Sequence, residues 1–98
     1  MEYKGPLSIY INVRPKRWRI TKSYGELKAL ERLSYFRKLG NTLNGVHEGV
    51  GVGGSFVLHI IFASQADKEA YEQDSSYKYF LRKLQRHSKR GGFQLLTN

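Results

Sequence analysis

The sequence predicts an α+β fold in which a four-stranded antiparallel sheet carries two helices on one face. Three observations lead to this prediction. Segments typical of strands, of which residues 7–13 alternate cleanly between polar and apolar residues, are separated twice by segments with a helical period. Glycine and proline mark the boundaries between the segments. The chain has 98 residues, 40% of them hydrophobic, which is enough for one modest core. We therefore expect residues 1–98 to form a single domain.

The first predicted strand spans residues 7–13, LSIYINV. Its odd-numbered residues are apolar and its even-numbered residues are polar or amphipathic, which is typical of a strand with one buried face. Pro15 follows and ends the strand, because proline has no N–H to donate to a neighbouring strand.

The first predicted helix begins near Ser23, after a basic loop. Ser23 is suited to cap the helix, and Glu26 three residues later completes a capping box. Gly40 and the Asn44-Gly45 pair predict its end. Apolar residues recur on one stripe of this helix: Leu30, Leu33, Phe36 and Leu39.

Two strands are predicted next, over residues 45–54 and 55–64, joined by a hairpin around three glycines (Gly51, Gly53 and Gly54). A helical period returns over residues 65–89, with a break predicted at Asp74-Ser75-Ser76. The pair Gly91-Gly92 is predicted to end this helix before a last short strand, FQLLT.

This order, βαββαβ, is that of the ferredoxin-like sandwich, whose antiparallel sheet has the strand order 4-1-3-2. In that arrangement the first strand–helix loop, the hairpin and the second helix–strand loop all lie at one edge of the sheet. The first and last of these segments contain ten of the seventeen basic residues: Arg14, Lys16, Arg17, Arg19, Lys22, Arg82, Lys83, Arg86, Lys89 and Arg90.

The charge of the chain favours a polyanionic partner. Seventeen Lys and Arg against eight acidic residues give a formal net charge of +9. The basic edge is predicted to bind nucleic-acid phosphates, with the hairpin glycines letting backbone N–H groups approach an anion. Trp18 stands between Arg17 and Arg19. We expect it to be partly exposed and to stack on an unpaired base; the alternative is that it covers one end of the core.

Two segments resemble the signatures of RNA-recognition-motif domains. IYINV, residues 9–13, is similar to the first signature, and GSFVLHIIF, residues 54–62, lies in the place of the second. The resemblance implies that Tyr10 and His59 stack on bases on the open sheet face. Val57 stands where the other stacking aromatic would be.

A second resemblance competes with the first. Residues 56–80, FVLHIIFASQADKEAYEQDSSYKYF, are similar to the third strand and second helix of dimeric α/β-barrel domains, including the pair Ala70-Tyr71 near the helix start. The resemblance implies that two chains pair sheet to sheet and bury Tyr10, Val57 and Ile61. It also implies a small-molecule-binding protein, in some members a monooxygenase.

Other chemistries find little support in the sequence. There are no cysteines, and the three histidines (His47, His59 and His87) lack metal-ligand spacing, so neither a metal nor a cofactor is predicted. Rolling-circle-type nucleases share a ferredoxin-like core, but Ile61 stands where their second histidine should be. No catalytic residue is assigned. The absence of cysteine, of a signal peptide and of a long apolar run predicts a cytoplasmic protein without a membrane partner.

The sequence therefore predicts a nucleic-acid-binding protein rather than an enzyme, with RNA or DNA as partner and with homodimerisation through the sheet face. The alternative is a homodimeric α/β-barrel protein that binds a small molecule, including a monooxygenase, and a degenerate nuclease ranks below both. The predicted binding residues are Tyr10, Arg14, Lys16, Arg17, Trp18, Arg19, Lys22, His59, Arg82, Lys83, Arg86, Lys89 and Arg90.

Overall fold

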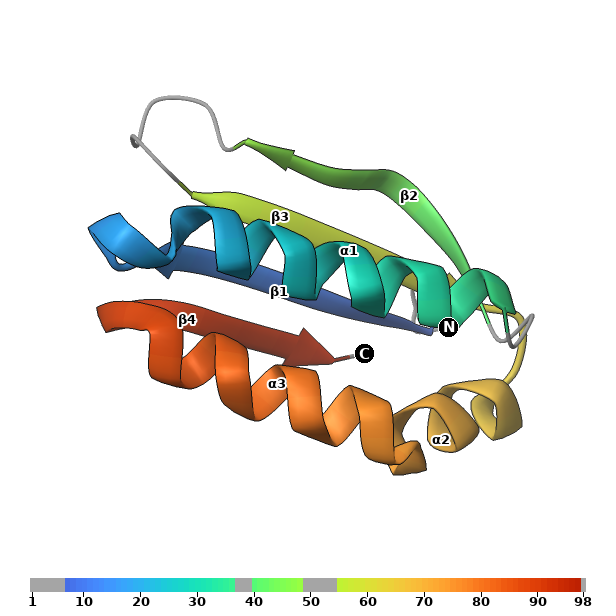
Figure 1. The fold of residues 1–98 in the computed structure, drawn as a ribbon. Coiled ribbons are helices and arrows are strands. Elements are labelled where there is room, and N and C mark those ends of the chain that lie inside the picture. Colours follow the sequence, from blue (N-terminus) through green and yellow to red (C-terminus); the bar gives the residue numbers. More distant parts are fainter. Residues whose placement is uncertain (1–6, 37–39, 49–54, 98) are drawn as a thin grey trace.

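A computed structural model describes residues 7–36, 40–48 and 55–97 of the chain. One sheet with the strand order β2-β3-β1-β4 is covered on one face by helices (Figure 1). The elements are β1 (Ser8–Pro15), the 3₁₀ turn η1 (Arg17–Arg19), α1 (Ile20–Phe36), β2 (Gly40–Glu48), β3 (Phe56–Phe62), α2 (Gln65–Gln73), α3 (Ser75–His87) and β4 (Ser88–Thr97). The fold is an α+β fold of the ferredoxin-like type, as predicted.

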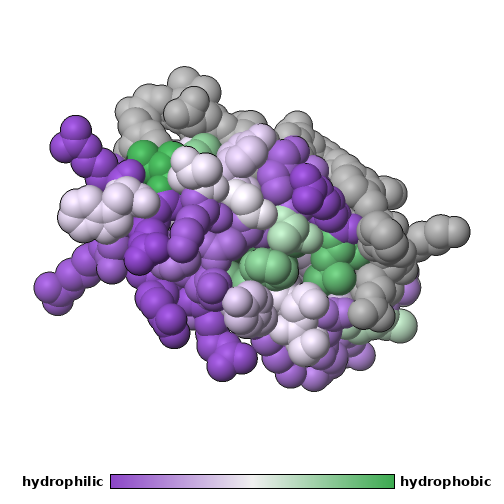
Figure 2. All heavy atoms as spheres, viewed as in Figure 1, coloured by the Kyte–Doolittle hydropathy of each residue, from purple (hydrophilic) through white to green (hydrophobic). Residues whose placement is uncertain are grey.

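All three strand pairs are antiparallel, so β1 and β2 run in the same direction. The end of β1, the start of α1, the end of α3 and the start of β4 therefore lie at the same end of the sheet (Figure 1). In the same view, hydrophilic side chains gather at this end, and a hydrophobic patch lies further along the seam between α1 and α3 (Figure 2). We call this end of the sheet the basic end, after residues 14–22 and 82–90, which meet there.

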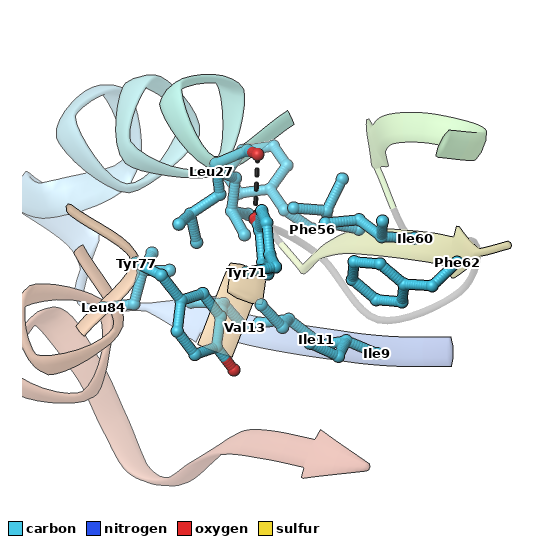
Figure 3. Close-up of a cluster of buried hydrophobic side chains, with 12 residues drawn as sticks. Ile9, Ile11, Val13, Leu27, Phe56, Ile60, Phe62, Tyr71, Tyr77 and Leu84 are labelled. Atoms are coloured by element: carbon cyan, nitrogen blue, oxygen red, sulfur yellow. Dashed lines mark hydrogen bonds between the residues drawn. The ribbon is translucent and has the colours of Figure 1, made fainter. Parts of the chain in front are cut away.

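The core lies between the sheet and the helices. The alternation seen in the sequence buries Ile9, Ile11 and Val13 on β1 completely, and β3 buries every second residue in the same way. Tyr71 of α2 is also fully buried, and its hydroxyl donates a hydrogen bond of 2.9 Å to the Leu30 carbonyl of α1 (Figure 3). Each aliphatic side chain buried in this way contributes about 1.5–3 kcal/mol to folding.

The start of the first helix differs from the prediction. α1 begins at Ile20, directly after η1, so Ser23 and Glu26 lie inside the helix and do not form a capping box. Both are buried, and Glu26 bonds His87 of α3 instead. The capping pattern failed as a signal because the 3₁₀ turn at Arg17–Arg19 starts the helix one turn earlier.

The predicted second helix is two helices, so the fold has three α-helices rather than two. The break falls at Asp74, whose backbone is extended. The Asp74 N–H donates to the Tyr71 carbonyl and closes α2, while its side chain accepts a hydrogen bond of 2.8 Å from the Ser76 N–H and caps α3. α3 then ends at His87, two residues before the predicted end.

The last strand begins earlier than predicted. Gly91 and Gly92 do not end a helix, because β4 already starts at Ser88. The pairing register between β1 and β4 shifts between Val13 and Pro15, and the glycines lie on β4 opposite this irregularity. Gly91 has φ of 73°, and a Cβ on Gly92 would come within 2.9 Å of the Arg14 carbonyl oxygen. The glycine pair therefore serves a bulge in the sheet.

The second strand occupies residues 40–48 rather than 45–54. The predicted hairpin glycines Gly51, Gly53 and Gly54 lie outside the described residues. None of the helices that the structure describes is long and apolar enough to cross a membrane.

Candidate functional site

The structure brings the two basic segments of the chain together at one end of the sheet. The Lys16 N–H donates a hydrogen bond of 2.7 Å to the His87 carbonyl, and Pro15 pairs with Ser88. Arg14 lies on β1, Arg17 and Arg19 in η1, and Lys22 in α1, while Arg82, Lys83 and Arg86 lie on α3 and Lys89 and Arg90 on β4.

Trp18 lies in η1 and does not cover the core. Its side chain is 83% exposed, the largest exposed fraction among the exposed hydrophobic residues described. Arg17 beside it is exposed and Arg19 is half-buried. The interpretation of Trp18 as a core cap is therefore wrong, and the indole is available to solvent.

Tyr10 and His59 lie together on the sheet face that the helices do not cover. They are paired across β1 and β3, and their rings meet edge to face with centroids 5.8 Å apart. Val57 and Ile61 are half-buried on the same face, and Leu96 is 53% exposed. This open sheet face is thus a mixed surface with an apolar component, and it is separate from the basic end.

A cleft of about 200 Å³ opens between α1 and α3, next to the basic end. Helical spacing builds it, since residues three and four apart lie on the same side of a helix. α1 contributes Lys22, Gly25 and Glu26, and α3 contributes Tyr79, Phe80, Lys83 and His87. We call this feature the α1–α3 cleft.

A buried pair of ionisable side chains lies in the wall of this cleft. His87 Nδ1 lies 2.8 Å from Glu26 Oε1, and the two residues are only 9% and 8% exposed. An ionised carboxylate can only accept, so His87 donates its Nδ1 proton to Glu26 in this state. The second carboxylate oxygen, Glu26 Oε2, is buried and has no hydrogen-bond partner among the residues that the structure describes.

The remaining lining of the cleft is aromatic and cationic. The Lys83 ammonium lies 5.1 Å from the centre of the Tyr79 ring, and Tyr79 meets Phe80 edge to face with ring centroids 5.2 Å apart. Lys22 is exposed on the opposite helix. The cleft therefore combines apolar surface with a few polar groups that converge on it, which is the usual composition of a small-molecule site.

Sequence reasoning missed the α1–α3 cleft. Glu26 was assigned to a capping box, and His87 was considered only as a possible metal ligand. A signal was present, because Glu26 directly precedes Leu27 and lies four residues before Leu30, both fully buried. An acidic residue on the buried side of a helix requires a partner. The sequence could not reveal that the partner is 61 residues away.

Metal and nucleophile chemistry gain no support from the structure. Within the described ranges, no group of three or more His, Asp or Glu side chains could hold a metal ion. Tyr71 is fully buried, and its hydroxyl donates a hydrogen bond to the Leu30 carbonyl, so it is not free to act as a nucleophile.

No protein-family model matches the sequence, and no curated protein matches it either. Solved structures do resemble the fold. A conserved protein of unknown function from Bacteroides thetaiotaomicron, described as a possible oxidoreductase, has a TM-score of 0.79 at 12% identity, covering 98% of both chains. Rv0793 from Mycobacterium tuberculosis has a TM-score of 0.79 at 13% identity, covering 96% of this chain and 93% of its own. An antibiotic biosynthesis monooxygenase has a TM-score of 0.75 at 12% identity, covering 94% and 95%.

These comparisons correct the functional prediction. The neighbours whose descriptions name a function are a possible oxidoreductase and an antibiotic biosynthesis monooxygenase. They contradict both the prediction of an RNA- or DNA-binding protein and the resemblance to RNA-recognition motifs. The second resemblance, to dimeric α/β-barrel domains, agrees with these neighbours. The error has two causes. RNA-recognition-motif domains and dimeric α/β-barrel domains share the element order βαββαβ, so the order does not distinguish them. A positive net charge favours anionic partners in general and does not indicate nucleic acid in particular.

Proposed function

We propose that this protein binds a small organic molecule, in the manner of the monooxygenase-like proteins that share its fold, and that it does so as a homodimer. The observation that carries the proposal is the α1–α3 cleft, a concave site in which a buried Glu26–His87 pair meets aromatic side chains. Small-molecule binding sites are typically lined by apolar side chains, with a few polar groups that point into the site. The monooxygenase activity named for some fold neighbours is part of this proposal only by analogy of fold.

The open sheet face supports the dimer. Tyr10, Val57 and Ile61 are half-buried there and Leu96 is more than half exposed, although no helix covers this face. A second copy of the chain, placed sheet to sheet, would remove these side chains from water.

Binding is tested by a thermal-shift screen of small aromatic and aliphatic compounds, followed by titration of every compound that raises the unfolding temperature. We expect at least one compound to stabilise the protein, because a ligand that binds only the folded state raises its stability. If no compound of a broad panel stabilises the protein, the proposed function fails.

The dimer is tested by measuring the mass of the protein in solution. Ile61→Glu would bury an unpaired charge between the two sheets and should yield monomers. Gln73→Glu adds the same charge at an exposed position of α2 and should leave the dimer intact. A monomeric wild-type protein, or an Ile61→Glu variant that stays dimeric, would refute pairing through this face.

Oxygenation is tested on the compounds that bind, with isotopically labelled dioxygen and an added reductant. A monooxygenase transfers one labelled oxygen atom to its substrate. Binding without label in any product would leave a small-molecule-binding protein and would exclude the enzymatic part of the proposal for those compounds.

A further inference from the structure

We infer that the basic end attaches the protein to the surface of an anionic lipid membrane, with Trp18 inserted among the lipid headgroups. The inference goes beyond the proposed function and does not depend on the α1–α3 cleft. Three features of the molecule lead to it: the positive charge of the basic end, the exposed apolar side chains within it and the position of the acidic residues.

The positive charge of the basic end is concentrated and is not neutralised. The end of β1 and the start of β4 are held together, because the Lys16 N–H donates to the His87 carbonyl and Pro15 pairs with Ser88. Residues 14–25 and 82–98 contain no acidic residue. Among the described residues, no carboxylate forms an ion pair with the six cationic side chains nearest this contact. They are Arg14, Lys16, Arg17, Arg19, Lys89 and Arg90, all exposed except the half-buried Arg19.

Apolar side chains lie among these charges. Trp18 is 83% exposed, so most of the indole can leave water without any change in the fold. Ile20 and Tyr24 are 39% and 40% exposed, and they lie on the same side of α1 because they are four residues apart. Trp and Tyr are enriched where lipid meets water, because each has a largely apolar ring with one polar group. A lipid surface would therefore remove this apolar area from water.

Half of the eight acidic residues lie at the opposite end of the molecule. They are Asp67, Glu69 and Glu72 of α2 and Asp74 at the start of α3. In Figure 1, α2 lies at one end of the fold, and the starts of α1 and β4 lie at the other. α3 joins the two ends with thirteen residues. At about 1.5 Å per residue it spans about 20 Å, more than the screening length of about 8 Å at physiological ionic strength. A negatively charged plane would therefore attract the basic end with little repulsion from these acids.

An anionic membrane matches both components of this surface, whereas a soluble polyanion matches only the charge. Each Lys or Arg near an anionic lipid surface strengthens binding about fivefold. The boundary between headgroups and acyl chains accepts apolar side chains to a depth of about 5–10 Å. The sequence predicted no membrane partner because it has no long apolar run. Such a run is needed to span a bilayer but not to lie on its surface.

The test uses the full-length protein and two kinds of lipid vesicle, one of phosphatidylcholine alone and one with about 30% phosphatidylserine. We expect the protein to sediment with the anionic vesicles only, and to be released as sodium chloride is added. Trp18 is the only tryptophan of the chain, so the fluorescence reports on the basic end alone. Its emission should shift to shorter wavelength on binding, and lipids brominated on their acyl chains should quench it.

Two kinds of variant separate charge from insertion. Lys89→Gln combined with Arg90→Gln should weaken vesicle binding more than tenfold. Arg32→Gln combined with Lys78→Gln is the matched control, because it removes the same charge from exposed positions outside the basic end and should change binding much less. Trp18→Ala should weaken binding about tenfold or more, because it removes the inserted ring. Trp18→Phe keeps a ring and should retain most of the binding.

Polyglutamate distinguishes a membrane from an acidic protein partner, since it offers carboxylates without a lipid phase. We expect it to bind more weakly than the anionic vesicles at equal concentration of charge, and with the same affinity to Trp18→Ala as to the wild type. Equal binding of polyglutamate and vesicles would indicate an acidic protein partner and would overturn the inference. The inference is also wrong if the anionic vesicles do not bind, if Trp18 emission neither shifts nor is quenched, or if the control pair weakens binding as much as the Lys89 and Arg90 pair. None of these outcomes decides whether the α1–α3 cleft binds a small molecule.

Discussion

Tyr71 of α2 connects the sheet to the two longer helices inside the core. It is fully buried, its ring packs against Phe62 of β3 and Tyr77 of α3, and its hydroxyl reaches the Leu30 carbonyl of α1. From the sequence, Tyr71 was noted only as part of the Ala70-Tyr71 pair, and this hydrogen bond could not be predicted because its acceptor is 41 residues away.

Tyr71→Phe should therefore lower the free energy of unfolding by about 1 kcal/mol, since it deletes one buried hydrogen bond and keeps the ring. Urea unfolding measures the change. Tyr79→Phe is the control, because Tyr79 is 50% exposed and its variant should stay within about 0.5 kcal/mol of wild type. Equal effects of the two changes would contradict the role assigned to Tyr71.

The buried tyrosines also predict how stability depends on pH. Burial raises the pKa of Tyr77 from 10.0 to about 12, with a further contribution from the charge of Glu72. Burial raises the pKa of Tyr71 in the same direction, helped by Tyr77 and Asp74. Above pH 10 the unfolded chain loses these protons while the folded chain keeps them, so the free energy of unfolding falls as pH rises.

The contribution of Tyr77 is fully present below about pH 10 and is lost as the pH rises toward about 12. Urea unfolding at pH 9, 10 and 11 should give a smaller decline for Tyr77→Phe than for wild type. Comparison of the two proteins removes the contribution of the lysines, which titrate in the same range. Parallel declines would contradict the raised pKa.

At the scale of elements, the sequence was sufficient where a local residue pattern determines the structure. It was not sufficient where contacts between distant segments determine where an element begins or ends. The polar–apolar alternation in β1 was sufficient to identify that strand, and the apolar segment of β3 next to the glycine-rich hairpin was sufficient to identify the other. The ends of the helices were not predictable. α1 begins earlier than predicted because it follows the 3₁₀ turn directly. α3 ends earlier than predicted because Ser88 pairs with Pro15 and belongs to β4. Both depend on contacts between segments distant in the sequence.

The break between α2 and α3 depends on Asp74, which the sequence did indicate. Asp74→Ala should cost about 1 kcal/mol of stability, because the Ser76 N–H loses its capping acceptor. Thermal or urea unfolding measures the loss. Ser75→Ala, at the neighbouring exposed position, should change stability much less, and a similar loss in both variants would argue against a capping role.

For the whole molecule, topology was predictable and function was not. The strand order brought the two basic segments to one end, as expected. The candidate site could not be predicted in the same way. The Glu26–His87 pair links residues 61 positions apart, and neither residue belongs to a recognisable motif. The net charge indicated the basic residues next to the α1–α3 cleft, but not the Glu26–His87 pair in its wall.

The concentration of positive charge at one end predicts a salt-dependent stability. Mutual repulsion should destabilise the fold at low ionic strength, where the screening length is about 30 Å, and less at physiological ionic strength, where it is about 8 Å. The unfolding temperature should therefore rise with sodium chloride. Lys16→Glu combined with Arg90→Glu should reduce this rise, and an unfolding temperature independent of salt in the wild type would contradict the prediction.

The extended backbone at Asp74 has a consequence for motion. It leaves α2 as a helix of nine residues that ends before α3 begins, and helices shorter than about 12 residues are marginal without packing. Lys68 and Tyr71 are the buried residues of α2. We therefore expect α2 to open more readily than α3, with Tyr71 as the residue that holds it to the core. In hydrogen–deuterium exchange, the amides of α2 should exchange sooner than those of α3, and Tyr71→Phe should widen that difference.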